Sequence, residues 1–108
     1  MRTLKFIING QTITLDSKCN LDGLSPGTKG YLQAEFTFSN EWDNCVKVAA
    51  FYSNLGIEYK PQVINNGTCM IPVEALKKSI FKVRVLGQRG DYTIRTNTIT
   101  IRQNGGIS

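Results

Sequence analysis

Residues 32–51 read LQAEFTFSNEWDNCVKVAAF, and this stretch decides the fold class. From Leu32 to Phe38 apolar residues alternate with polar ones, a two-residue period that is typical of a strand with one buried face. A second strand-like run ends at Phe51, and the short connection between the two runs contains Trp42, the only tryptophan of the chain. We therefore predict two strands that are joined at one end of a sheet.

Trp42 allows two interpretations. In the first, its indole fills the core of the domain and packs against aromatic side chains such as Phe36, Phe51 or Phe81. In the second, the indole is a surface platform for a sugar ring, as in a carbohydrate-binding module. That arrangement would also use nearby rings and polar groups, namely Tyr59 or Tyr92 with Glu41, Asp43 and Asn44. We favour the core role for Trp42.

The pair Asn9–Gly10 predicts a tight turn in a hairpin near the start of the chain. If these two residues form the turn, Phe6 lies opposite Ile13 and Leu4 lies opposite Leu15. Both apolar pairs then fall on one face of the hairpin, so the register is self-consistent.

A second pair, Asn66–Gly67, predicts another hairpin by the same counting. It would place Ile64 opposite Cys69 and Val63 opposite Met70. Because these four residues include little polar material, we expect the second hairpin to be buried.

The C-terminal part predicts one short helical turn and two more strands. Pro72 can take the first position of a helical turn near residues 72–78, and lysines follow in its last turn. Residues 80–86 and 97–102 alternate like strands, and in the first of them Lys82 and Arg84 point away from the apolar side. About seven to nine short strands with turn signals between them favour an all-β sandwich.

Length and composition allow one domain. With 108 residues and 41% apolar content, the chain can build one core, so we assign residues 1–104 to a single sandwich domain and residues 105–108 to a short C-terminal tail. Residues 17–30 (SKCNLDGLSPGTKG) are long for a connection inside a small domain, and we expect either a contact surface or a mobile loop there. No apolar run approaches about 18 residues, so we expect a soluble protein without a membrane partner.

Residue patterns for catalysis and metal binding are missing from the sequence. The chain has no histidine, which excludes Ser-His and Cys-His pairs and a mixed Cys/His zinc site. Glu41 and Asp43 are the only local carboxylate pair, and we expect no acid–base role for them. Three scattered cysteines, Cys19, Cys45 and Cys69, suggest free thiols, no disulfide and assembly in a reducing cytoplasm. We expect no enzyme activity, no metal and no cofactor.

Positive charge is concentrated in the last third of the chain. Residues 1–76 carry six Lys/Arg and seven Asp/Glu, whereas residues 77–108 carry seven Lys/Arg and one Asp, so the net charges are −1 and +6. If the last strands pair, four residues form a basic patch: Lys82, Arg84, Arg89 and Arg95. An acidic protein is one partner for this patch, and a merely solvated sheet face is the alternative. We do not expect nucleic acid, because no aromatic residues interleave with the basic ones for base stacking.

Three segments of the chain together resemble a known family. In order they read FTFSNEWDNCVKVAAF (residues 36–51), NNGTCMIPVEAL (65–76) and FKVRVLGQRGDYTIRTNTITI (81–101). This order resembles small β-sandwich structural proteins of phages and prophages of Gram-positive bacteria, which occur alone or at the N-terminus of baseplate and fibre proteins. The resemblance covers about Leu4 to Arg102.

The resemblance implies an immunoglobulin-like, antiparallel sandwich that acts as a virion component. It implies assembly in the bacterial host cytoplasm, several copies on the particle, and other virion proteins as partners. Because no fibre or receptor-binding head follows residue 108, we expect a capsid (head) decoration protein that binds the major capsid protein. A baseplate or tail adaptor is the alternative within this class, and a carbohydrate-binding module that uses Trp42 is the alternative from another class.

Overall fold

The structure is a computed structural model that describes residues 2–16 and 32–102. This part contains nine strands and two short helical segments. In chain order they are β1 (Arg2–Asn9), β2 (Thr12–Leu15), β3 (Leu32–Phe38), η1 (Asn40–Trp42), β4 (Val46–Ser53), β5 (Gln62–Val63), β6 (Thr68–Met70), α1 (Val73–Leu76), β7 (Ile80–Arg89), β8 (Tyr92–Arg95) and β9 (Ile99–Arg102). The loop predicted at residues 17–30, with Cys19, and the tail predicted at residues 105–108 lie outside the described residues.

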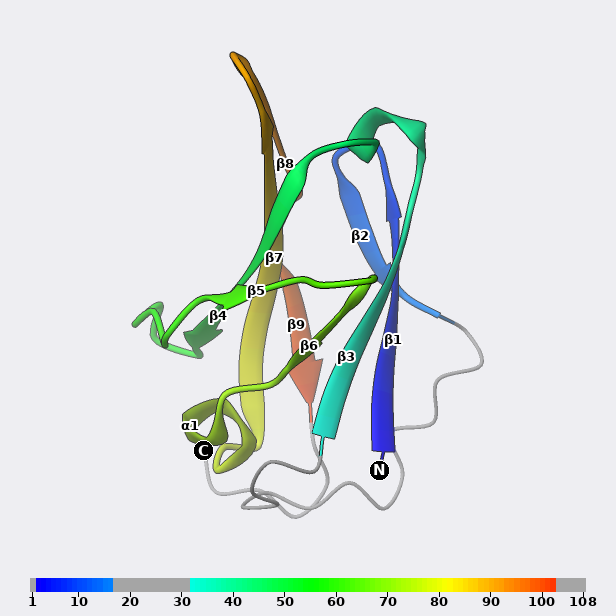
Figure 1. Cartoon of the computed structure of the whole chain (residues 1–108). Helices are drawn as coiled ribbons and strands as arrows, with labels where there is room; N and C mark the ends of the chain where they lie inside the picture. Colours follow the sequence, from blue (N-terminus) through cyan, green and yellow to red (C-terminus); the bar gives the residue numbers. More distant parts are fainter. Residues whose placement is uncertain (1, 17–31, 103–108) are drawn as a thin grey trace.

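The strands form two facing sheets (Figure 1). The first sheet has the order β2-β1-β3-β6, and the second has the order β5-β4-β7-β8, with β9 also paired to β7. The predicted all-β sandwich is therefore confirmed. Among the described strands one pairing departs from an antiparallel arrangement, because β1 and β3 are parallel. A parallel pair needs a connection of a dozen or more residues, and the segment between β2 and β3 is long enough to supply it.

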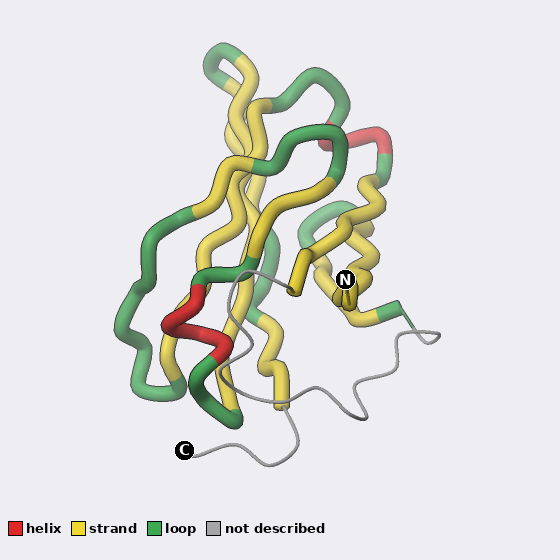
Figure 2. Tube along the Cα trace, turned by 60° about the horizontal axis from the view of Figure 1, so that its bottom comes forward, coloured by secondary structure: helices red, strands yellow, loops and turns green. Residues whose placement is uncertain are grey.

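The two helical segments lie at opposite ends of the sandwich (Figure 2). The turn predicted near residues 72–78 occurs as α1, which follows Pro72 and buries Ala75 and Leu76. At the other end, η1 turns the chain from β3 into β4 and buries Trp42.

The first hairpin has a different register from the predicted one. Phe6 lies opposite Leu15 and Ile8 lies opposite Ile13, so the two turn residues are Gly10 and Gln11. Gly10 has a φ of 57°, and glycine at the first central position is what a type II′ turn requires. The predicted pairs Phe6–Ile13 and Leu4–Leu15 were wrong because the turn lies one residue later than predicted, which sets Ile8 opposite Ile13 and Phe6 opposite Leu15.

The second hairpin exists only at its tip. Asn65 pairs with Thr68 around Asn66–Gly67, whose φ angles of 53° and 78° are both positive, as a type I′ turn requires. Beyond this pair the strands separate, since β5 joins β4 and β6 joins β3. The predicted pairs Ile64–Cys69 and Val63–Met70 were therefore wrong, because β5 and β6 belong to different sheets. The expected burial was wrong for Val63 and Met70, which are exposed.

Aromatic side chains from both sheets fill the core. Phe36, Phe51, Phe81 and Trp42 all lie in one buried cluster. Phe6 stacks on Phe36 with ring centroids 5.2 Å apart, while the rings of Phe51 and Phe81 lie 6.3 Å apart across the second sheet. This core determines which side chains of each strand are left on the outer faces.

Candidate functional site

Trp42 is a packing residue. Its side chain is fully buried, and its indole N–H donates a hydrogen bond of 2.7 Å to the carbonyl oxygen of Gly10. The indole lies 5.3 Å from the ring of Phe38, and a Cβ atom added to Gly87 would approach the indole to 2.7 Å. Of the aromatic neighbours, Phe38 touches the indole, whereas the sequence pointed to rings deeper in the core. A fully buried indole cannot stack on a sugar ring at the surface.

The polar residues beside Trp42 lie around η1. A hydrogen bond with the Ser39 hydroxyl, and then one with its own backbone, lowers the pKa of the Glu41 carboxyl. Glu41 is therefore ionised at neutral pH and cannot serve there as a general acid. The Arg89 guanidinium lies 4.7 Å from the ring centroid of Tyr92, so one face of that ring is occupied by a cation.

The predicted basic residues divide between two places. Burial alternates along β7, and Lys82 and Arg84 occupy its outward positions. Arg95 lies opposite Leu86 in the β7–β8 register, which puts it on the same outer face. Arg102 lies opposite Ile80 on β9 and joins this face too. We call Lys82, Arg84, Arg95 and Arg102 the basic face.

Arg89 does not belong to the basic face. It lies two residues beyond Gly87, on the positions of β7 that point inward. Its guanidinium donates a hydrogen bond to the backbone carbonyl oxygen of Asp43 and covers the ring of Tyr92. Arg89 therefore joins the β7–β8 hairpin to the η1 end of the sandwich.

Arg102 was missed at the sequence level although its signal was present. Ile99 and Ile101 alternate with Thr100 and Arg102, so the last strand has its own outward positions. What the sequence could not supply was the pairing of β9 with β7, which places Arg102 opposite Ile80 and on the same outer face as Lys82.

The outer faces of the two sheets differ in charge. Among the described strand residues of the first sheet, Lys5 and Glu35 are the charged outward side chains, and they lie opposite each other. The second sheet carries the four residues of the basic face and, at a bridge to Tyr52, the carboxylate of Glu58. The positive surplus of the C-terminal part is thus gathered on one broad surface.

Apolar side chains continue this surface. Val46 and Val63 are 67% and 56% exposed. Val48 lies opposite both Val63 and Leu86, so these residues form a short row across β5, β4 and β7. We call Val46, Val48, Val63 and Leu86 the apolar row.

Arg84 is held in place by a tyrosine. Its Nε donates a hydrogen bond of 2.9 Å to the Tyr52 hydroxyl, and its guanidinium lies 5.6 Å from the Tyr52 ring centroid. These two groups line a shallow hollow of about 370 Å³, together with Gly56, Lys82 and Thr98. We call it the basic hollow.

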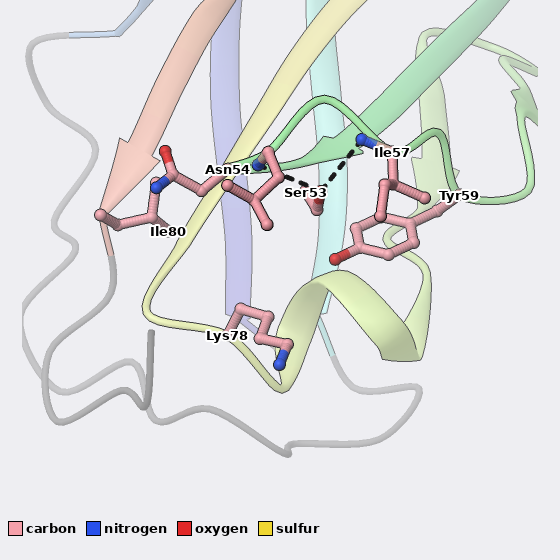
Figure 3. Close-up of a pocket in the computed structure, with 7 residues that line it drawn as sticks. Ser53, Asn54, Ile57, Tyr59, Lys78 and Ile80 are labelled. Carbon is pink, nitrogen blue, oxygen red and sulfur yellow. Dashed lines mark hydrogen bonds between the residues drawn. The ribbon is translucent and has the colours of Figure 1, made fainter.

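A second hollow of about 320 Å³ lies at the α1 end of the sandwich (Figure 3). Its lining comes from the end of β4 and the chain that follows it, from the chain after α1 and from the start of β7: Ser53, Asn54, Leu55, Ile57, Tyr59, Lys78 and Ile80. Burial, and to a lesser degree the charge of Glu74, raises the pKa of the Tyr59 phenol, which stays a hydrogen-bond donor at neutral pH. We call this the apolar hollow.

The described cysteines are free thiols within the core. Cys45 and Cys69 are both buried. Burial raises the pKa of the Cys69 thiol to about 12, so this group is protonated and unreactive at neutral pH.

Residues 2–16 and 32–102 contain no group of three or more His, Cys, Asp or Glu side chains placed to hold a metal ion. Within the same ranges, no helix has the length and apolar character needed to cross a membrane. Comparisons of the chain with protein-family models, with curated proteins and with solved structures give no match.

Proposed function

We propose that this protein is a non-enzymatic structural protein of a phage particle that attaches through the outer face of its second sheet to an acidic protein surface. The observation that carries the proposal is the basic face. Four cations share one sheet surface there, whereas Lys5 and Glu35, the described outward strand charges of the first sheet, balance each other. A surface of one sign steers and orients a partner of the opposite sign.

The apolar row supports a protein as the partner. Specific interfaces have an apolar centre and a polar rim, and Val46 and Val63 are exposed apolar side chains on the same outer face as the cations. A small anion would use the charges but not these valines. A protein surface with carboxylates around an apolar centre would use both.

The assignment to a phage particle rests on the resemblance of residues 36–51, 65–76 and 81–101 to sandwich proteins of that origin. Within that class we favour decoration of the capsid, with several copies bound to the major capsid protein. A baseplate or tail adaptor is the second candidate. The carbohydrate-binding alternative loses its main platform, because Trp42 is buried.

The two candidates are separated by a binding experiment. Purified protein would be mixed with heads and with tails isolated from particles of the phage or prophage whose genome encodes the chain, prepared without it. We expect saturable binding to heads at many copies and none to tails. Saturable binding to tails alone would make the adaptor correct, and binding to neither would refute a role in the particle.

A further inference from the structure

The loop from Ser53 to Ile57 contributes to both hollows. Gly56 lines the basic hollow, and Leu55 and Ile57 line the apolar hollow. Leu55 and Ile57 are 87% and 64% exposed, which is unusual for such large apolar side chains. The loop therefore presents apolar groups and borders cations at the same edge of the second sheet.

Hydrogen bonds hold this loop in shape. The Ser53 hydroxyl accepts bonds of 3.2 Å and 3.0 Å from the backbone N–H groups of Leu55 and Ile57. The backbone of Ser53 bonds to Ile57 and Gly56 as well. Because the loop is already ordered, a partner that contacts it does not bear the entropic cost of ordering it.

The basic hollow is suited to a carboxylate. Tyr52 accepts the Nε–H of Arg84 and supports its guanidinium plane, which leaves the two terminal nitrogens for a bidentate contact. Lys82 adds a second cation, and Thr98 completes the lining.

The distance between the hollows follows from β7. Ile80 lines the apolar hollow and Lys82 lines the basic hollow, two residues apart on the same outer side of the strand. Side chains at such positions are about 7 Å apart along a strand. An extended partner segment has the same spacing between its own residues i and i+2.

From this match we infer that the Ser53–Ile57 edge binds an extended protein segment with a large aliphatic residue followed, two positions later, by Asp or Glu. The aliphatic side chain enters the apolar hollow, and the carboxylate meets Arg84 and Lys82. This inference rests on the proposed function and names the chemistry of the partner at that surface.

The test uses short peptides as probes. Isotope-labelled protein is titrated with acetyl-Leu-Thr-Glu-amide while backbone amide NMR shifts are followed. We expect saturable shifts at Gly56, Ile57 and Lys82. Two control peptides, acetyl-Leu-Thr-Gln-amide and acetyl-Ser-Thr-Glu-amide, should each bind at least about fivefold more weakly, since one lacks the charge and the other lacks the apolar group.

Variants of the protein identify the hollows. Leu55→Ser should weaken binding of the Leu-Thr-Glu peptide about fivefold, whereas Met70→Ser, at an exposed position of the first sheet, should leave it unchanged. Tyr52 is a positioning residue for Arg84. Tyr52→Phe should weaken binding of the Leu-Thr-Glu peptide and leave binding of the Leu-Thr-Gln peptide unchanged. A general loss of structure would weaken the binding of both peptides.

Several results would overturn the inference. Equal binding of the three peptides, no saturable shift, or shifts away from the Ser53–Ile57 edge would each do so. A concentration-dependent dimer that buries Gly56 without peptide would make a second copy of the chain the occupant instead. Peptide binding at this edge by a protein that binds neither heads nor tails would leave the inference standing and refute the proposed role in the particle.

Discussion

The packing of the large Trp42 side chain depends on Gly87, which has no side chain. The indole lies directly on Gly87, where even a single added carbon would come within 2.7 Å of it. Its N–H bonds to the turn of the first hairpin, so one residue ties η1, β7 and the β1–β2 turn together. The stability of this end of the sandwich should therefore respond to changes at either partner.

We predict that Trp42→Ala lowers the free energy of unfolding by about 3–5 kcal/mol, as large core truncations do. Gly87→Ala should lower it by about 1–3 kcal/mol because it overfills the same contact. Denaturant unfolding measures both, with Gln88→Ala at the exposed neighbouring position as the control.

In the double variant, Trp42→Ala removes the group that the new methyl would strike. The double variant should therefore lose less unfolding free energy than the sum of the losses in the two single variants. Additive losses, or a Gly87→Ala protein that unfolds like the parent, would contradict the contact.

Cys69 gives a prediction about pH. Its pKa is about 12 in the folded protein, whereas an unfolded thiol has a pKa of about 8.5. The folded state therefore holds the proton more tightly, so this contribution is complete below about pH 8.5 and is lost as the pH rises toward 12.

The measurement is the free energy of unfolding of the parent and of Cys69→Ala between pH 8 and pH 11. Because lysines and tyrosines titrate in both proteins, the difference between the two curves reports on Cys69. The free energy of unfolding of the parent minus that of Cys69→Ala should fall steadily with rising pH. A constant difference would mean that the thiol is not shielded from water.

The three cysteines also carry a redox prediction. We expect no disulfide, since the number of cysteines is odd and the two described ones, Cys45 and Cys69, are buried free thiols. Alkylation of the unfolded protein without reductant, followed by intact-mass measurement, should give three modified cysteines. A single modified cysteine would reveal a bridge.

At the level of elements, the turn between β5 and β6 depends directly on which residue stands at position 66. Asn66 has a φ of 53°, a conformation that asparagine and glycine tolerate better than other residues. Asn66→Ala should lower the free energy of unfolding by about 1–2 kcal/mol, while Asn66→Gly should leave it nearly unchanged. Equal stability of the two variants in denaturant would argue against this turn conformation.

Prediction of elements from the sequence succeeded where the alternation of apolar and polar residues within one strand was sufficient. The alternation in β7 located its core side, and with it the outward direction of Lys82 and Arg84. It failed where the arrangement depends on pairing between strands that are distant in the sequence. Nothing local shows that β5 and β6 leave their shared turn for different sheets, or that β1 lies parallel to β3.

The candidate surface illustrates the same limit. Arg89 and Arg95 flank one turn in the sequence, yet they end on opposite sides of the sheet because β7 extends to Arg89 and keeps its alternation. Arg102 enters the basic face only through the pairing of β9 with β7. The contact of Phe38 with Trp42 likewise depends on the path of η1, which no periodicity describes.

At the scale of the whole molecule, the described part of the sandwich has a first sheet whose outward strand charges balance and a second sheet whose outer face is positive. Exposed charges are screened over about 8 Å at physiological ionic strength, so binding through the basic face should weaken as salt rises. The apolar row should leave a part of the affinity that salt does not remove. A protein that used only charge would lose all binding at high salt.

The most direct test of the central claim uses two double variants of this protein, each with two lysines or arginines changed to glutamate. It measures how many copies of each variant bind to isolated phage heads or tails. Lys82→Glu with Arg84→Glu changes the basic face, whereas Lys5→Glu with Lys77→Glu changes one position on the first sheet and one at the C-terminal end of α1. With folding checked by thermal unfolding, the first variant should show much lower occupancy and a flatter salt dependence, and the second should match the parent. Equal occupancy of both folded variants across a range of salt would contradict the claim that the second sheet is the binding surface.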